Sequence, residues 1–328
     1  MKGVRFLEFG DPRDVLAFTD VPTPVPDPGQ VRVRITHRPI NPSDLQTIQG
    51  IYPVQVKPPA SPGLEGVGRI DALGEGVSGL SVGQRVISLA GTPGTWADQL
   101  VIPAERALPI PDAMPDTVAA QAIANPVTAW ALVNDETQLK EGDWLLQTAA
   151  ASTLGKLIIQ LARRRGVRTL NVVHRRAQVD DVLESGGDAV VCTEHETLAA
   201  RVSEIAGSDG VAWALDSVGG ETGAQVAGSL RPGGSMLSVG LLSGTTLGPL
   251  DARALIFNGI TIRGFWVMEW FRRRPADVIG RALTEVMTLL ATGDLRPPTE
   301  AEYPLRDFKR ALDHATRTGR RGKVLLVN

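Results

Sequence analysis

The chain has very little of the chemistry that disulfides and metal sites need. Cys192 is the only cysteine among 328 residues, and four histidines are present. A single thiol excludes an intramolecular disulfide and every metal site built from several thiolates. Because disulfides persist mainly in oxidising compartments, we expect a protein of the reducing cytoplasm.

Long apolar runs and a surplus of positive charge are also missing. No stretch approaches the roughly 18 apolar residues of a membrane span, and the N-terminal MKGVRFLEFG lacks the apolar run and cleavage site of a secretory signal. Lys and Arg total 34 against 36 Asp and Glu, so no overall positive field attracts nucleic acid. We expect a soluble protein with neither a membrane nor a nucleic acid as partner.

The hydrophobic pattern predicts an α/β fold with two domains, because the length exceeds what one core usually fills. The first 125 residues contain short β segments between Gly and Pro, with alternating Val31, Val33 and Ile35. Residues 126–266 alternate strand and helix patterns, which is typical of a parallel, doubly wound sheet. We therefore predict a β-rich domain of residues 1–125 and 267–328, to which the final strand KVLLVN returns, and a nucleotide-binding domain of residues 126–266.

The expected elements of the second domain can be placed along the chain. Its predicted strands are 144–148, 168–174, 188–192, 211–217, 235–240 and 260–265, and a long amphipathic helix is expected at 275–292.

A turn of small residues follows the first of these strands. Such a turn lets backbone N–H groups and a helix N-terminus approach a pyrophosphate. Its residues are Ala149, Ala150, Ala151, Ser152, Thr153, Leu154 and Gly155. Most glycines of the usual fingerprint are replaced, and small residues here also serve close packing, so this motif alone leaves both interpretations open.

The next strand ends in His174, Arg175 and Arg176. An acidic residue is usual there when the ribose of NAD is bound, whereas guanidinium groups pair with a 2′-phosphate. The sequence therefore favours NADPH over NADH. The alternative is a solvated basic loop.

Proton transfer must accompany a hydride transfer, so a proton donor is expected. A zinc alcohol dehydrogenase site is excluded, since the thiolates are missing and Leu64 stands where a His ligand is wanted. The chain has two tyrosines, Tyr52 and Tyr303, and Tyr52 follows the polar, turn-rich run 41–51. A phenol is protonated at neutral pH and can donate to a developing enolate, although a loop tyrosine taken alone more often serves packing.

Several motifs together resemble one known family. They are PINPSDLQTIQGIY, GLEGVG, GTWADQLV, NPVTAW, RTLNVVHRR, SVGG, LIFNGITIRGFW and the late Lys323. Nearly the whole chain is similar to the mitochondrial-type trans-2-enoyl-thioester reductases of the zinc-free medium-chain dehydrogenase/reductase superfamily, beside the quinone reductases. The resemblance implies a GroES-like catalytic domain, a Rossmann domain with a doubly wound parallel sheet, NADPH as cofactor, an enoyl-CoA or enoyl-acyl-carrier substrate, a role in fatty acid metabolism, and a homodimer.

The resemblance also implies roles for matching residues. Tyr52 matches the proton donor, and Asn125 matches a residue beside the nicotinamide. The other matches are cofactor-binding positions: Ala151, Ser152, Thr153, Leu154, Gly155, His174, Arg175, Arg176, Val239, Gly240, Leu241, Leu242, Phe265, Trp266, Val267, Met268 and Lys323. The segment 239–242 has leucine where the mitochondrial relatives tend to have a second glycine, so a changed acyl pocket is expected.

Some residues have plainer interpretations. Glu65 is expected to hydrogen-bond its own tight turn rather than act as a base, and Asn41, Ser43 and Asp44 to stabilise a turn. The run Arg272–Arg274 is either a solvated face or a site for the phosphates of a carrier arm.

The leading hypothesis is NADPH-dependent reduction of the C2=C3 bond of 2-enoyl thioesters, with no metal. The alternative is a zinc-free NADPH:quinone or enone reductase. A remote alternative is a non-catalytic protein that binds NADPH or RNA.

Overall fold

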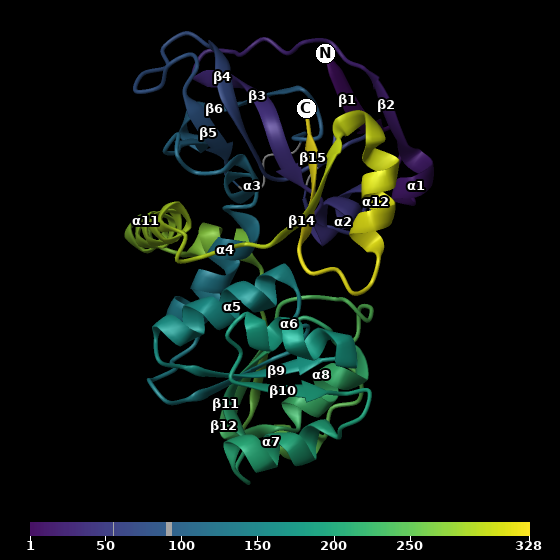
Figure 1. Cartoon of the computed structure of the whole chain (residues 1–328), viewed down its shortest axis with the longest axis vertical. Coiled ribbons are helices and arrows are strands. Elements are labelled where there is room, and N and C mark those ends of the chain that lie inside the picture. Colours follow the sequence, from purple (N-terminus) through teal and green to yellow (C-terminus); the bar gives the residue numbers. More distant parts are fainter. Residues whose placement is uncertain (55, 90–93) are drawn as a thin grey trace. The chain divides into compact units, whose positions relative to one another are not determined.

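The structure is a computed structural model, and it describes residues 1–54, 56–89 and 94–328. Backbone contacts divide the chain into two compact units (Figure 1). Unit 1 comprises Met1–Pro126 and Thr284–Asn328, and unit 2 comprises Val127–Leu283. The predicted domains assigned residues 267–283 to the first domain, whereas their contacts place them in unit 2.

Unit 1 is built mainly of β-strands. Its elements are β1 (Lys2–Phe6), α1 (Pro12–Val15), β2 (Leu16–Asp20), β3 (Gln30–Pro39), α2 (Pro42–Gln49), β4 (Gly66–Leu73), β5 (Arg85–Ser88), β6 (Gln99–Pro103), β7 (Ala107–Pro109), α3 (Asp116–Ala119), β14 (Thr299–Pro304), α12 (Phe308–Thr316) and β15 (Lys323–Val327), with short 3-10 turns at Ala104–Arg106 and Leu305–Asp307. The main sheet has the order β14-β15-β3-β4-β5-β7, and β6 pairs with β3. Strand β15 runs antiparallel to β3, which confirms that KVLLVN joins the first part of the chain.

The core of unit 1 follows the predicted alternation. Val31, Val33 and Ile35 of β3 are buried and pack with Ile70 and Val86 from the neighbouring strands. Their period of two places all three on one face of the strand, so a strand with one buried face forms here.

Unit 2 has the predicted alternation of strands and helices. Its elements are η2 (Ala131–Glu136, a π-helix), β8 (Trp144–Gln147), α5 (Thr153–Arg164), β9 (Arg168–Val173), η3 (Arg176–Gln178), α6 (Val179–Glu184), β10 (Ala189–Cys192), α7 (Leu198–Ala206), β11 (Val211–Asp216), α8 (Gly220–Ala227), β12 (Leu230–Ser238), α9 (Ala252–Ile256), β13 (Thr261–Gly264) and α10 (Val267–Arg273). Two further helices, α4 (Ala124–Trp130) and α11 (Ala276–Thr292), run across the boundaries between the units. The predicted strands and the long helix are thus all present, with ends shifted by a few residues.

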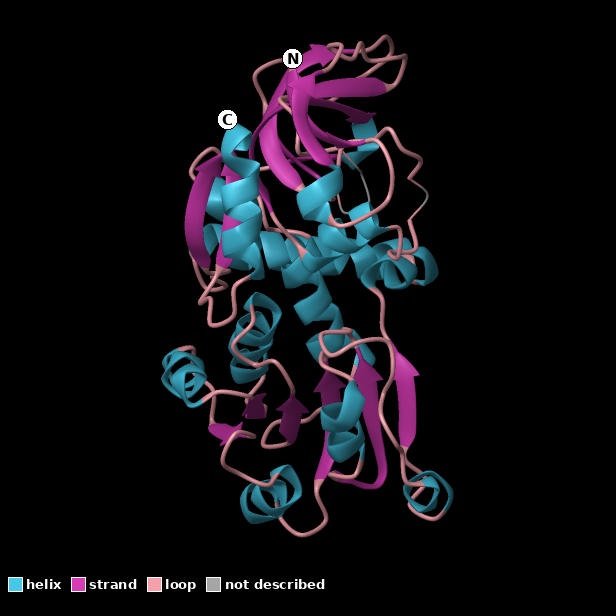
Figure 2. Cartoon of the chain, turned by 90° about the vertical axis from the view of Figure 1, so that its right-hand side faces the viewer, coloured by secondary structure: helices cyan, strands magenta, loops and turns pink. Residues whose placement is uncertain are grey.

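The sheet of unit 2 has the order β10-β9-β8-β11-β12-β13, and every neighbouring pair is parallel. Helices lie on both sides of it (Figure 2). The first strand of this sheet along the chain is the central β8. β9 and β10 follow on one side of it, and the chain then crosses to β11 on the other side. Ligands of such sheets bind beyond the carboxyl ends of the strands, beside this reversal between β8 and β11. The predicted α/β fold class is confirmed.

Residues 267–283 join unit 2 because α10 is tied to the π-helix η2. The indole N–H of Trp270 donates to a carboxylate oxygen of Asp135 at 2.7 Å, and Arg274 pairs with both Asp135 and Glu136. Nothing in the hydrophobic pattern shows these ion pairs, since they join residues about 135 positions apart.

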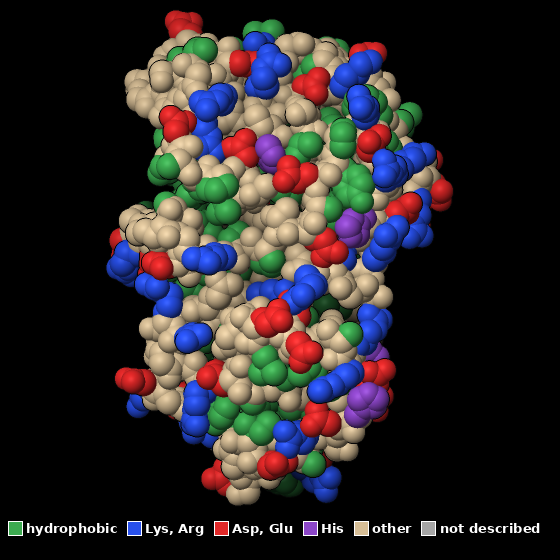
Figure 3. Space-filling model, viewed as in Figure 1, with side chains coloured by type: hydrophobic (Ala, Val, Ile, Leu, Met, Phe, Trp, Pro, Cys, Tyr) green, Lys and Arg blue, Asp and Glu red, His purple; other side chains and the backbone are tan. Residues whose placement is uncertain are grey.

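The surface shows both signs of charge. Lys and Arg side chains are interspersed with Asp and Glu on the face seen in Figure 3, in line with the near-equal totals in the sequence. Among the described residues, no helix is both long enough and apolar enough to cross a membrane.

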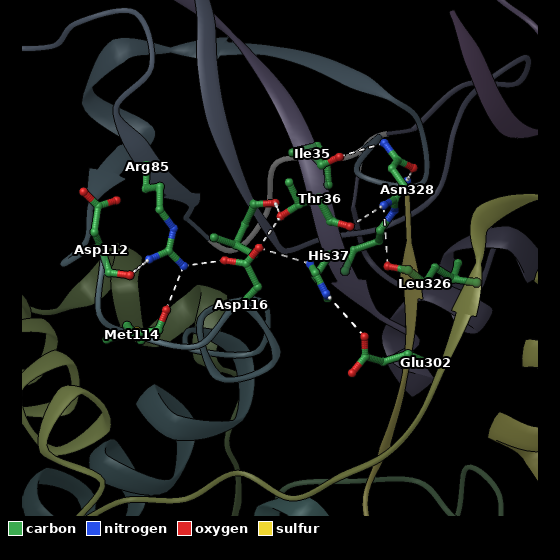
Figure 4. Close-up of polar contacts among 12 residues, drawn as sticks. Ile35, Thr36, His37, Arg85, Asp112, Met114, Asp116, Glu302, Leu326 and Asn328 are labelled. Carbon is green, nitrogen blue, oxygen red and sulfur yellow. Dashed lines mark hydrogen bonds and ion pairs between the residues drawn. The ribbon is translucent and has the colours of Figure 1, made fainter.

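A chain of polar contacts ties β3, β5, α3 and β14 together in unit 1 (Figure 4). Asp116 is its centre: it accepts from Thr36 at 3.0 Å, pairs with Arg85, and lies 3.3 Å from Nδ1 of His37. Nε2 of His37 lies 3.4 Å from a carboxylate oxygen of Glu302. The His37 contact and the bonds from Thr36 and Arg85 hold the pKa of Asp116 well below its usual range.

We expect Asp116→Asn to lower the free energy of unfolding by about 2 kcal/mol at pH 7, because buried Arg85 loses its charged partner. A lowered pKa means that the carboxylate stabilises the fold above the ordinary Asp pKa of about 4 and loses this contribution as pH falls below it. The loss caused by the substitution should therefore shrink below about pH 4. Urea unfolding at several pH values measures it, with Asp112→Asn as control, because that side chain is 82% exposed. Equal losses in the two variants would contradict the role of Asp116.

Candidate active site

The small-residue turn follows β8 and leads into α5. Ser152 caps α5 by accepting the N–H of Gly155 at 3.0 Å, and Ala149 adopts a positive φ of 51°. A Cβ at Gly155 would lie 2.4 Å from the carbonyl oxygen of Ala150, so only glycine lets the helix approach the turn so closely. Such a cradle, at the N-terminus of a helix, fits the pyrophosphate of a dinucleotide.

Asp216 is a buried carboxylate that was not predicted from the sequence. It lies where the strand order reverses, between β8 and β11. Asp216, at the end of β11, accepts from the Thr148 hydroxyl at 2.7 Å and from the N–H of Gly219 at 2.9 Å. The Thr148 hydroxyl in turn accepts the N–H of Ser217 at 2.8 Å. An acidic residue ending the apolar strand VAWALD, just before SVGG, was the available signal.

The basic segment lies where it was expected, directly after β9. His174, Arg175 and Arg176 are all exposed. The His174 ring lies 3.3 Å from the Thr193 hydroxyl, and the backbone N–H of Arg176 donates to Glu194. Within the described parts of the chain, neither guanidinium group forms an ion pair, so both are available to an anionic ligand.

The two later segments extend the same edge of the sheet. The N–H of Val239, after β12, donates to the carbonyl of Asp216 at 2.7 Å, and that of Phe265, after β13, donates to Ser238 at 2.8 Å. Leu241 and Leu242 are exposed, Phe265 is buried, and Trp266, Val267 and Met268 are partly buried. Because all strands are parallel, their carboxyl ends bring the four predicted segments of unit 2 to one edge.

The run Arg272–Arg274 is ion-paired. Arg272 and Arg273 both pair with Glu269 on the same helix, and Arg274 pairs with Asp135 and Glu136. These contacts favour the interpretation of Arg272 and Arg273 as a solvated face, and they give Arg274 a structural partner.

In unit 1, Tyr52 comes just after α2. The helix starts at Asn41, whose N–H donates to Asp44 at 2.8 Å in a capping box, and it ends at Gly50 with a positive φ of 76°. The N–H of Tyr52 then donates to the carbonyl of Gln46 at 3.2 Å. The phenol side chain is partly exposed. The predicted proton donor thus follows a helix that is fixed at both ends, and Asn41 and Asp44 stabilise the turn at its start, as expected.

Charged groups are buried together next to α2. They are Asp44, Glu65 and Lys323, and the side chain of Asn41 lies among them. Lys323 donates to Oδ1 of Asn41 at 2.5 Å, and Nδ2 of Asn41 donates to Glu65 at 2.8 Å. Burial raises the pKa of Asp44 to about 7 and lowers the pKa of Lys323 to about 8. Burial also raises the pKa of Glu65.

The expectation that Glu65 bonds its own turn is wrong. Its second carboxylate oxygen accepts the N–H groups of Ile123 at 3.2 Å and Ala124 at 2.9 Å, at the start of α4. These partners lie 58 and 59 residues away along the chain, so a local turn motif cannot reveal them.

Asn125 is the next residue of α4. Its side-chain Nδ2 is buried and has no hydrogen-bond partner among the described residues. A buried donor without a partner is costly, and a carboxamide acceptor such as that of a nicotinamide would satisfy it.

Comparisons with known proteins agree with this geometry. The family model "Alcohol dehydrogenase GroES-like domain" matches residues 27–112, and "Zinc-binding dehydrogenase" matches residues 153–283. A mitochondrial enoyl-[acyl-carrier-protein] reductase of Xenopus tropicalis is 31% identical over 99% of this chain and 95% of its own. Its name places that relative in mitochondria, so the expected cytoplasmic location stays a prediction.

Solved structures are similar over the full length. One, from Bacillus thuringiensis, is provisionally described as an NADPH:quinone reductase; it is 32% identical, has a TM-score of 0.93, and the match covers 100% of this chain and 98% of that one. A mycobacterial protein in complex with NADPH is 27% identical with a TM-score of 0.88, and the match covers both chains fully.

The fold and the strand-end site define a nicotinamide-dependent oxidoreductase of the medium-chain dehydrogenase/reductase class. The chain belongs to the zinc-free, quinone oxidoreductase-like family of that class, which confirms the resemblance. In the described part of the chain, no group of three His, Cys, Asp or Glu side chains is arranged to hold a metal.

Proposed function

We propose that this protein reduces the C2=C3 double bond of 2-enoyl thioesters with NADPH. The observation that carries the proposal is Tyr52, a partly exposed phenol placed directly after the capped helix α2. The full-length similarity to enoyl-[acyl-carrier-protein] reductases supports it. A role in fatty acid metabolism is part of the same proposal.

The edge of the parallel sheet would hold the cofactor. Residues Ala151–Gly155 would bind the pyrophosphate, and Arg175 and Arg176 the 2′-phosphate, with His174 beside it. The segments 239–242 and 265–268 would complete the site. The buried Nδ2 of Asn125, which has no hydrogen-bond partner among the described residues, would donate to the nicotinamide. When bound, NADPH supplies a hydride to the β-carbon.

Tyr52 would complete the reduction. The thioester carbonyl of the substrate holds the negative charge that develops as an enolate, and the phenol of Tyr52 delivers its proton to the α-carbon. Rigid placement of that phenol matters, because a positioned donor makes proton transfer effectively unimolecular. The Gly50 cap and the bond from the backbone N–H of Tyr52 to Gln46 fix the backbone that carries the phenol.

The test is an NADPH-oxidation assay across 2-enoyl-CoAs of increasing chain length, with the corresponding enoyl-acyl carrier protein and a quinone alongside. We expect turnover of the enoyl thioesters and recovery of the saturated thioester as product. Turnover of the quinone alone would overturn the proposal.

A second candidate is an NADPH:quinone or enone reductase. The Bacillus thuringiensis structure favours it, because it shares the whole fold at an identity of 32%, close to the 31% of the Xenopus relative. Such a reaction needs no dedicated proton donor, so substitution of Tyr52 would leave it intact.

We also propose a homodimer that pairs through β13. This strand is at one end of the sheet of unit 2, and Ile256 and Phe257, a few residues before it in the chain, are 70% and 77% exposed. A sheet edge beside exposed apolar side chains commonly pairs with a second copy.

We expect Phe257→Asp to weaken this dimer about 30-fold, since an aromatic side chain that the dimer would bury is replaced by a charge. Light scattering after size-exclusion chromatography at several concentrations measures it. The control is Val82→Asp, another exposed apolar side chain, on unit 1. An unchanged mass for Phe257→Asp would remove β13 as the interface.

A further inference from the structure

Glu65 connects elements that are far apart in the sequence. One carboxylate oxygen accepts from Asn41 at the start of α2, and the other accepts two backbone N–H groups at the start of α4. The first N–H groups of a helix have no partner inside the helix, and a negative charge there is favourable. Glu65 therefore fixes where α4 begins, one residue before Asn125.

The orientation of Asn41 is decided by its two neighbours. A lysine ammonium only donates and a carboxylate only accepts, so Oδ1 must face Lys323 and Nδ2 must face Glu65, as the structure has it. The amide thus connects a buried positive charge to a buried negative charge. Lys323 is only 7% exposed.

We propose that Glu65 is a positioning residue for Asn125, acting through the start of α4, and that Lys323, through Asn41, supplies the positive charge that balances it. Lys323 thereby has a structural role in the ligand-free protein, beyond the cofactor contact that family resemblance predicts. The link to cofactor binding rests on the proposed role of Asn125.

The first experiment measures hydrogen exchange of the 120–130 segment in Glu65→Gln. We expect amide exchange there to be about fivefold faster, the effect of losing a helix cap. The matched control is Asp44→Asn, which changes another fully buried carboxylate of the same cluster that bonds Asn41 and Leu64 rather than α4. Unchanged exchange in Glu65→Gln, or equal changes in both variants, would overturn the proposal.

A double-mutant cycle then tests whether Glu65 acts through Asn125. The readout is the NADPH dissociation constant from nicotinamide fluorescence, which needs no enoyl substrate. We expect Glu65→Gln and Asn125→Ala each to weaken binding, and the double variant to bind no more weakly than Asn125→Ala alone. Additive losses of NADPH affinity, or no loss from Asn125→Ala, would overturn the proposal. Failure of the proposed enoyl reductase function would be seen separately, as no turnover of enoyl thioesters by the protein without substitutions.

A third experiment tests the role of Lys323 as the counter-charge of Glu65. Its readout is the Tm, so it remains informative if Glu65→Gln destabilises the fold. A glutamine at position 65 has one acceptor oxygen for two sets of donors, the side-chain amide of Asn41 and the N–H groups at the start of α4. One set stays unsatisfied as long as Lys323 holds Asn41 in its present orientation. We expect Lys323→Met and Glu65→Gln each to lower the Tm of the ligand-free protein, and the double variant Glu65→Gln with Lys323→Met to recover part of the loss, because Asn41 can then flip. Additive losses in Tm, or an unchanged Tm for Lys323→Met, would overturn the counter-charge role.

Discussion

Replacing Tyr52 by Phe is expected to lower kcat for a 2-enoyl thioester by about 100-fold or more, since a positioned general acid contributes a factor of about 10² to 10⁴. The ring and its packing remain, and only the transferable proton is lost. The dissociation constant of NADPH should stay unchanged, because the hydroxyl is assigned to the substrate. Steady-state kinetics at saturating NADPH measure the first quantity and fluorescence titration the second.

Tyr303→Phe is the matched control, because the chain has only these two tyrosines. The Tyr303 hydroxyl lies 3.0 Å from Nδ1 of His314 on α12, within the fold of unit 1. We expect full turnover from this variant. Full turnover from Tyr52→Phe as well would show that the proton comes from elsewhere and would favour the quinone or enone reductase.

The double substitution Arg175→Ala with Arg176→Ala is expected to weaken NADPH binding by about 100-fold while NADH binding changes little. Each charged hydrogen bond to the 2′-phosphate contributes about 1.5–3 kcal/mol, and NADH lacks that phosphate. Both side chains are exposed after β9 and have no ion-pair partner in the described ranges, so no internal ion pair is lost with them. Titration of both cofactors at two salt concentrations measures the difference, which should shrink as salt rises.

A pair of arginines elsewhere provides the control. Arg272→Ala with Arg273→Ala removes the same charge from unit 2, but both side chains pair with Glu269 on α10. We expect NADPH affinity to change by less than about twofold. Equal losses of NADPH and NADH affinity in the Arg175 and Arg176 variant would mean that these residues shape the site without selecting the phosphate.

Much of the fold could be predicted because its signals are local. The alternation of Val31, Val33 and Ile35 marks a strand with one buried face, and all three are buried in β3. The small-residue turn before α5 and the basic segment after β9 could be placed for the same reason. In a parallel sheet, residues that follow strands reach one edge whatever the details of packing.

Residues that act across long sequence separations could not be predicted in this way. Trp270 and Arg274 join unit 2 through Asp135 and Glu136. Unit 2 therefore ends at residue 283 and not at residue 266, where the predicted domain ended. Asp216 was overlooked because its partners come from the residue after β8 and from the loop after β11.

The sequence by itself determined the class of fold, the strand ends proposed to bind the cofactor, and Tyr52 as the candidate donor, because each depends on a short pattern or on a motif of the family. Only the tertiary structure decided the partners of Glu65 and Lys323. Lys323 and Asn41 are 282 residues apart, and Glu65 reaches α4 from 59 residues away. Burial leaves these charged groups no water to bind, so each must find a partner in the fold, and that choice is made by the packing of distant elements.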